Sequence, residues 1–128
     1  MSLELSKKTE FKRRFKKRCF TFSLDILKLT EVLRTNRNAW SLVDQLIRSA
    51  TSIGANIVEG GNSTSKKEFI NYFQIALKSA SETLYWLALL REICPQAKEE
   101  LNKLIQECTE IKKLISTVIL NTKRNSKF

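Results

Sequence analysis

The sequence predicts an all-α protein, an antiparallel up-down-up-down four-helix bundle. Its 128 residues include only three glycines and one proline, too few for the turns of a β-sandwich or barrel. Apolar residues recur at spacings of three and four through four long segments, which is the period of an amphipathic helix. With 42% hydrophobic residues, a chain of this length can bury one continuous core. Four helices with short connections pack most simply as an antiparallel bundle.

The first predicted helix carries an apolar stripe that runs to Leu33 and ends at the polar stretch 34–38. It begins either near Phe11, with lysines and arginines on its other faces, or only near Thr21, after a loose arm. Residues 1–8 are expected to be frayed. The second helix, over 40–59, has one apolar face at i, i+3, i+4 spacing. Gly60, Gly61 and Asn62 are predicted to end it, since glycine or asparagine accepts a left-handed turn.

The third helix is predicted over 66–93, because Ser65 and Glu68 form a capping box in which each side chain binds a free backbone N–H. It is apolar over two arcs rather than one. Either it is central in the monomer, or its second face meets another subunit. Pro95 marks the next turn, and a fourth helix over 96–121 has a single apolar stripe. The second arc of the third helix contains Ile75, Trp86, Leu89 and Ile93, beside Glu68, Ser79 and Glu82.

Charge divides the chain into a basic N-terminal arm or helix extension at 1–18, a four-helix bundle at 19–122 and a basic C-terminal tail at 123–128. The chain has 23 Lys and Arg against 13 Asp and Glu, a net charge of +10. The arm holds eight basic and two acidic side chains, and the tail holds three basic ones, which leaves +1 for the body. The body is therefore nearly neutral between two cationic ends.

The cysteines and the hydropathy pattern predict a cytoplasmic protein. Cys19, Cys94 and Cys108 stand singly without CxxC spacing, and no histidine is present to complete a zinc site. We interpret them as small core hydrophobes in a reducing compartment rather than as redox groups. No apolar run approaches the ~20 residues that cross a bilayer, and the N-terminus lacks the apolar stretch of a secretory signal.

The residue types argue against an enzyme, and no cofactor or metal is predicted. Without histidine, the chain cannot form a histidine-dependent triad or an HExxH metal site. The glycine pair at 60–61 follows a helix, whereas a phosphate-binding loop should follow a strand. Glu59, Glu68 and Glu82 remain candidates for acid–base chemistry. Ion pairing with Arg48 in a bundle seam is the commoner role, and an enclosed polar pocket around the three would instead indicate catalysis.

The basic stretch KKTEFKRRFKKR at 7–18 predicts contact with a polyanion. Lys and Arg bind phosphates by releasing condensed counterions. Phe11 and Phe15 could stack on unpaired bases, although their four-residue spacing favours core packing. The alternatives are a solvated basic face that binds nothing specific and, less favoured, a membrane-surface helix. The predicted nucleic-acid contacts are Lys7, Lys8, Lys12, Arg13, Arg14, Lys16, Lys17 and Arg18.

The second helix also carries a polar stripe on the side away from its apolar face. Solvation explains this stripe as well as a polar seam between subunits does. In a seam, Arg48 would pair with Glu82 or Glu59. The predicted subunit-interface residues are Arg48, Ser52, Asn56, Glu59, Glu68, Ile75, Ser79, Glu82, Trp86 and Ile93.

The runs IRSATSIGANIVEG at 47–60 and STSKKEFINYFQIALKSASETLYWLALL at 63–90 resemble a known four-helix-bundle family, the 23S rRNA intervening-sequence proteins. The accessory variability protein of diversity-generating retroelements is related to that family. The resemblance implies a ring-like homo-oligomer, typically a pentamer, with nucleic-acid or reverse-transcriptase binding in the retroelement branch. Many members carry a Gly-Arg pair where this chain has Asn62 and Ser63. The family's motif residues map onto Arg48, Ser52, Asn56, Glu59, Gly60, Ser65, Glu68, Phe69 and Glu82.

These observations predict a non-enzymatic homo-oligomeric scaffold, expected to be a pentamer, that binds structured RNA or an RNA–DNA hybrid through clustered basic residues. Assembly would multiply the arms, so that weak contacts add through effective concentration. The alternative is a protein-interaction adaptor, such as an accessory subunit of a reverse transcriptase or another acidic partner, with the arm as its docking surface. No membrane contact is expected.

Overall fold

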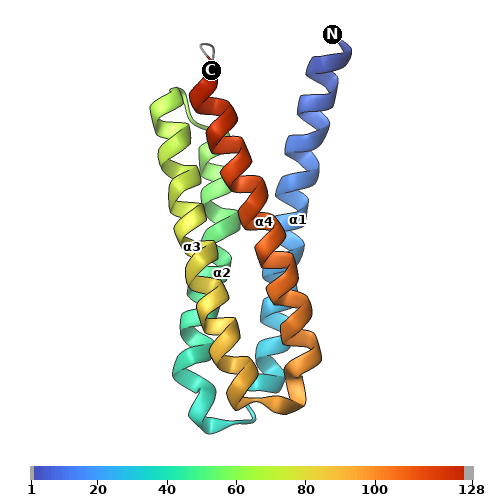
Figure 1. Ribbon diagram of the computed structural model, residues 1–128, viewed down its shortest axis with the longest axis vertical. Coiled ribbons are helices and arrows are strands. Elements are labelled where there is room, and N and C mark those ends of the chain that lie inside the picture. Colours follow the sequence, from blue (N-terminus) through green and yellow to red (C-terminus); the bar gives the residue numbers. More distant parts are fainter. Residues whose placement is uncertain (1, 126–128) are drawn as a thin grey trace.

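The computed structural model describes residues 2–125, and this part of the chain contains four α-helices and no strand, which confirms the predicted all-helical class. The helices lie along the long axis of the molecule, and successive connections alternate between its two ends (Figure 1). The first and last described residues therefore lie at the same end, and we call the opposite end the turn end. The helices are α1 (Leu3–Leu33), α2 (Trp40–Gly61), α3 (Lys66–Ile93) and α4 (Lys98–Arg124), with 3-10 turns at Arg37–Ala39 and Pro95–Ala97.

Helix α1 begins earlier than either predicted start. The hydroxyl of Ser2 accepts a hydrogen bond from the Leu5 N–H at 3.1 Å and caps the helix, which is continuous from Leu3. The fraying expected for residues 1–8 and the loose arm before Thr21 are thus wrong for the described residues. The physical reason is composition: residues 3–20 contain no Gly or Pro and are rich in Lys, Arg and Leu, which are good helix formers.

The connection between α2 and α3 confirms one prediction and corrects another. The Ser65 hydroxyl accepts from the Glu68 N–H at 3.1 Å, and α3 spans 66–93 as predicted. The left-handed turn is wrong, because no residue of 2–125 has a positive φ and α2 continues to Gly61. Gly60 has another role: a Cβ there would lie 2.9 Å from the Phe73 ring, so the absent side chain lets α2 and α3 approach closely.

The core runs along the whole bundle and receives fully buried side chains from all four helices, among them Phe22, Leu46, Leu87 and Ile115. Helix α3 packs against both α2 and α4, whereas α1 packs chiefly against α2. This central position accounts for the first apolar arc of α3, and Trp86 of the second arc also packs against the core. Two members of its second arc, Ile75 and Ile93, nevertheless remain 38% and 40% exposed.

The three cysteines are buried free thiols, as predicted. Burial raises the pKa of Cys19 and of Cys108 to about 12, and it raises the pKa of Cys94 as well. The thiols therefore stay protonated at neutral pH and behave as core side chains. Within residues 2–125, no helix combines the length and the hydropathy that crossing a membrane requires.

Candidate nucleic-acid interface

The fold brings the two basic ends of the chain to one end of the molecule. Helix α1 starts there, α3 starts there with Lys66 and Lys67, and α4 ends there with Lys123 and Arg124 (Figure 1). We call this the cationic end. It carries four carboxylates, those of Glu4, Glu10, Glu59 and Glu68. Its eleven described basic residues are Lys7, Lys8, Lys12, Arg13, Arg14, Lys16, Lys17, Lys66, Lys67, Lys123 and Arg124.

The N-terminal half of α1 presents its basic side chains to solvent. None of residues 3–14 is buried, and this half of the helix diverges from α4 (Figure 1). Seven of the eight predicted contact residues, all except Arg18, are exposed. Arg13 forms an ion pair with Glu10 at 2.6 Å, one turn earlier on the same helix. An exposed pair of this kind is weak, so the segment remains strongly cationic.

Arg18 differs from the other predicted contact residues. Its guanidinium donates two hydrogen bonds of 2.7 Å to the Glu107 carboxylate and also pairs with Glu110. The hydrogen bonds that Arg18 donates to Glu107 raise the pKa of Arg18 further. This bidentate geometry fixes α1 to α4. Arg18 is therefore a structural anchor at the base of the basic segment rather than a free phosphate-binding group.

The two phenylalanines of the basic stretch have separate environments. Phe15 is buried and Phe11 is 43% exposed, with ring centroids 5.9 Å apart. Core packing, the favoured interpretation, holds for Phe15. Phe11 instead lies at the border between the core and the lysine-rich surface, where an aromatic face is accessible.

Lys66 joins the start of α3 to the end of α4. Its ammonium donates hydrogen bonds to the backbone carbonyls of Lys123 and Asn125, at 3.3 and 2.5 Å. Carbonyls at a helix C-terminus carry partial negative charge, which a lysine stabilises. Sequence reasoning missed this contact because the acceptors are backbone atoms. The contact holds together two of the three helices that build the cationic end.

The predicted ion pair of the polar stripe is formed within one chain. Arg48 on α2 lies 3.6 Å from the Glu82 carboxylate on α3. The indole N–H of Trp86 donates to the same carboxylate at 3.2 Å. Both partners of the ion pair are partly exposed, so the pair borders the solvent beside Trp86.

The small polar residues also find their partners inside the protomer. The Ser79 hydroxyl donates to Ser52 at 2.9 Å, and the Asn56 amide donates to the Ser52 carbonyl at 2.8 Å. Ser79 is only 8% exposed. One turn away, the Thr83 hydroxyl donates to Ser49 at 2.9 Å. The polar seam thus lies between α2 and α3 of a single chain, and Ser52 and Ser79 need no second subunit to satisfy them.

The remaining predicted site residues do not converge. Glu59 and Glu68 are exposed at the cationic end, and Glu82 is half-buried against Arg48 and Trp86. The three carboxylates therefore do not form the enclosed polar pocket that would indicate an enzyme. Ile75 and Ile93 stay partly exposed on α3.

Helix α1 carries an exposed apolar stripe that sequence reasoning did not single out. Phe20, Leu24 and Leu27 are 66%, 40% and 42% exposed. Their spacing of four and three places them on one face of the helix. That spacing was visible in the sequence, but the buried stripe of the same helix has the same period and is longer.

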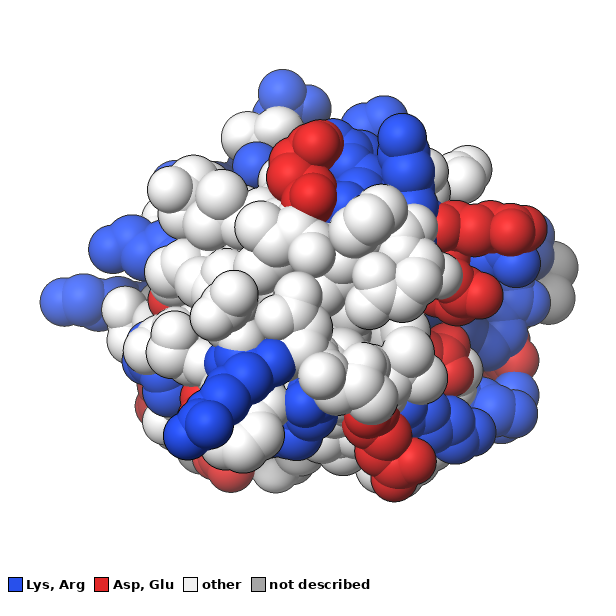
Figure 2. Space-filling model, turned by 90° about the horizontal axis from the view of Figure 1, so that it is seen from below, with Lys and Arg blue, Asp and Glu red and all other residues white. Residues whose placement is uncertain are grey.

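The turn end lacks the excess of positive charge found at the cationic end. Figure 2 shows this end of the molecule, where uncharged residues occupy the centre and side chains of both signs lie around it. The charge of the protein is thus asymmetric along its long axis. Such asymmetry orients a polyanion toward the cationic end.

Fold and surface together define an all-helical protein whose basic residues gather at one end. Residues 12–117 match the family model described as 23S rRNA-intervening sequence protein, and the chain belongs to this family. A crystal structure of a protein of unknown function from the S23 ribosomal protein family of Bacteroides thetaiotaomicron is similar, with 37% identity and a TM-score of 0.76. The match covers 82% of this chain and 97% of that chain. None of the curated proteins matches the chain significantly.

Proposed function

We propose that the protein is a non-enzymatic, homo-oligomeric helical scaffold that binds RNA through its cationic end. The observation that carries the proposal is the convergence of both basic chain ends, where eleven Lys and Arg accompany four carboxylates. Each phosphate that such side chains neutralise releases counterions and adds to the affinity. The family description concerns 23S rRNA, which makes RNA the nucleic acid to test first. Three buried free thiols favour the reducing cytoplasm as its location.

Exposed apolar side chains support the assembly of antiparallel four-helix protomers. Ile75 and Ile93 on α3, and Phe20 on α1, leave apolar area in water that a second copy would cover. The family resemblance implies a pentameric ring. In an oligomer, several cationic ends act on one RNA, and binding at the second end is favoured by the high effective concentration.

The test is RNA binding by two variants with the same number of lost charges. K12Q/R14Q/K16Q/K17Q removes four cations from the cationic end, and K28Q/R37Q/K98Q/K103Q removes four near the turn end. Substitution is preferable to deletion of residues 1–18, because deletion would also remove buried Phe15 and the anchor Arg18. We expect the first variant to lose about tenfold or more in affinity at physiological salt. The second variant should stay within about threefold of the parent protein.

Equal affinities of the two variants would contradict the proposal, since they would show that the position of the removed charges does not affect RNA binding.

The alternative function is an adaptor for an acidic protein such as a reverse transcriptase. It is favoured by the exposed apolar stripe of Phe20, Leu24 and Leu27, because binding of a polyanion does not require exposed apolar side chains. An adaptor predicts that F20S/L24S abolishes capture of such a partner while the solution mass of the protein is unchanged.

A further inference from the structure

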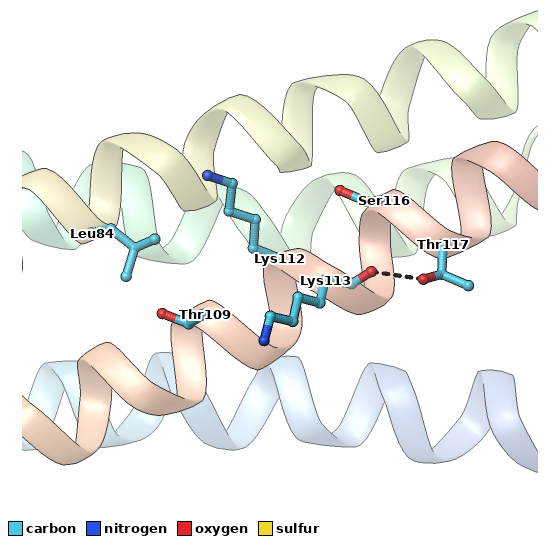
Figure 3. Close-up of a pocket in the computed structure, with 6 residues that line it drawn as sticks. All are labelled: Leu84, Thr109, Lys112, Lys113, Ser116 and Thr117. Atoms are coloured by element: carbon cyan, nitrogen blue, oxygen red, sulfur yellow. Dashed lines mark hydrogen bonds between the residues drawn. The ribbon is translucent and has the colours of Figure 1, made fainter.

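A second basic surface lies outside the eleven residues of the cationic end. An open groove of about 520 Å³ runs between α3 and α4. Figure 3 shows its two lysines diverging from α4, with Lys112 on the side of α3. No carboxylate lines this groove. Its lining residues are Leu84 from α3 and Thr109, Lys112, Lys113, Ser116 and Thr117 from α4.

The positive charge of the two groove lysines is not balanced by neighbouring carboxylates. Neither Lys112 nor Lys113 forms an ion pair within residues 2–125. The nearest acidic residues along α4 are Glu107 and Glu110, and both carboxylates are bound by Arg18. The anchor that fixes α1 to α4 therefore offsets one of the two negative charges beside the groove, and the two lysines outnumber the one that remains. Two ammonium groups remain available to an anion.

The hydroxyl groups of the groove differ in what they can offer to a ligand. Thr109 donates to the Ile105 carbonyl at 2.8 Å, and Thr117 donates to the Lys113 carbonyl at 3.0 Å, the bond dashed in Figure 3. A hydroxyl has one proton, so these two can only accept from a ligand. The Ser116 hydroxyl makes no hydrogen bond in the described part of the chain and is free to donate. Because the two ammonium groups diverge, they suit separate phosphates along a strand, and the free Ser116 O–H can donate to one of these phosphates.

No acidic residue of α4 separates the groove from the cationic end. Residues 111–125 of α4 contain no Asp or Glu. On α3, residues 66–81 contain a single acid, Glu68, at the cationic end itself. The path from Lys113 to Arg124 measures about 16 Å along α4. A short stretch of nucleic acid can therefore span both sites without passing a carboxylate on α4.

We propose that Lys112, Lys113 and Ser116 bind phosphates of the same RNA strand that the cationic end holds, and so extend the interface along the groove between α3 and α4. This inference rests on the proposed function, and it specifies where the strand leaves the cationic end. A strand too short to reach the groove makes no contact with these three residues.

The experiment compares K112Q/K113Q with K98Q/K103Q, a pair of lysines on the same helix near the turn end. Each is titrated with single-stranded RNA of about 6 and about 20 nucleotides over a range of salt concentrations. For the long RNA, we expect K112Q/K113Q to reduce the salt slope by about one to two. For the short RNA, the salt slope of K112Q/K113Q should equal that of the parent protein. The salt slope of K98Q/K103Q should equal that of the parent protein for both RNA lengths. S116A should weaken binding of the long RNA about threefold or more.

If K112Q/K113Q and K98Q/K103Q show the same salt slope with the long RNA, the inference about the groove is wrong. The proposal that RNA binds at the cationic end would not be affected. A second readout separates the two proposals: NMR of the parent protein titrated with inorganic tripolyphosphate. Shifts of the amides at 112–117 that vanish in K112Q/K113Q are expected from a phosphate site. If these shifts occur but the protein binds no RNA, both the RNA-binding function and RNA as the ligand of the groove are wrong. The groove would then bind a free phosphate compound.

Discussion

Among the basic residues of the segment 1–18, Arg18 holds the fold together and the others face solvent. It meets Glu107 in a bidentate pair while Arg14 and Lys17, on the same helix, are exposed. The difference follows from the helical period: Arg18 lies near the boundary of the buried stripe, beside Cys19, and can reach α4. The same residue type therefore serves packing or binding according to its position on the helix.

We predict that R18Q destabilises the protein by about 1 kcal/mol. The side chains of this ion pair are about one-third exposed, and solvent screening limits such pairs to roughly that value. R13Q is the matched control, because it removes an exposed pair within one helix, and it should destabilise the protein markedly less than R18Q. Urea unfolding monitored by circular dichroism measures both. Equal destabilisation by the two substitutions would show that Arg18 has no anchoring role.

We predict that G60A and G61A have opposite effects on stability. At Gly60 a Cβ would meet the buried Phe73 ring at 2.9 Å, so alanine should cost about 1–3 kcal/mol. At Gly61 the neighbour is the flexible Lys16 side chain at 3.3 Å, so alanine should be neutral or stabilise by up to about 1 kcal/mol through its helix propensity. Thermal unfolding of both variants distinguishes the positions. A G60A protein as stable as the parent would contradict the close approach of α2 to α3.

The buried thiols make stability depend on pH in the alkaline range. The pKa of Cys19 and Cys108 is about 12 in the folded protein, against 9.0 ordinarily. Between these values the unfolded chain loses its thiol protons and the folded chain keeps them, so stability falls as pH rises. The contribution is about 1.4 kcal/mol per pH unit for each thiol, and it is fully present below pH 9. The unfolding free energy of C19A/C108A should decline less steeply from pH 9 to 11 than that of the parent protein; parallel declines would refute the assignment.

At the scale of elements, the sequence was most informative where side-chain chemistry is local. The period of apolar residues and the Ser65 cap predicted α3 to its first and last residue. The sequence was least informative where a contact with another helix determines the role of a residue. Gly60 carries the composition of a left-handed cap, but its role is set by Phe73, which no local pattern reveals. The early start of α1 was missed because residues 1–8 were expected to be frayed and the helix was expected to begin near Phe11 or near Thr21.

The sequence also predicted the local features of the candidate site but not the contacts between helices that complete it. The exposed lysines and arginines of α1 follow from composition and helical period alone. Glu82 was one of the two partners predicted for Arg48, and the ion pair joins two helices of one chain. Sequence patterns do not distinguish a seam inside a protomer from one between protomers, since both need polar groups that face each other. The charge beside the groove at Lys112 depends on the pairing of Glu110 with Arg18, a contact between residues that are 92 apart in the chain.

The first twelve residues of α1 should be its least stable part. Residues 3–14 bury no side chain, and helices of about 12 residues are marginal without packing. Amide hydrogen exchange should therefore be fast for residues 3–11 and slow beyond Phe15, by a factor of about 100 or more. Addition of RNA should slow exchange in the first segment, because phosphates relieve repulsion among its cations. Equal protection along all of α1 in the free protein would contradict this account.

For the whole molecule, the partly exposed apolar face of α3 predicts self-association. I75K/I93K should dissociate the protein into monomers of 14.8 kDa, the mass of one chain, because burying two lysines in an interface is unfavourable. L120K is the control, since Leu120 is an apolar side chain that is 53% exposed and lies on α4 rather than on α3. Light scattering at micromolar concentration gives the mass. A monomeric parent protein would contradict assembly and the multivalent mechanism with it.

The charge asymmetry of the molecule leads to the most direct measurement, the salt dependence of RNA binding by the parent protein. If the cationic end neutralises at least four phosphates, the logarithm of the association constant should fall with the logarithm of salt concentration with a slope of about −3 or steeper. The slope should be roughly halved in K12Q/R14Q/K16Q/K17Q. A slope near zero, or one that this variant leaves unchanged, would show that the cationic end does not hold the RNA.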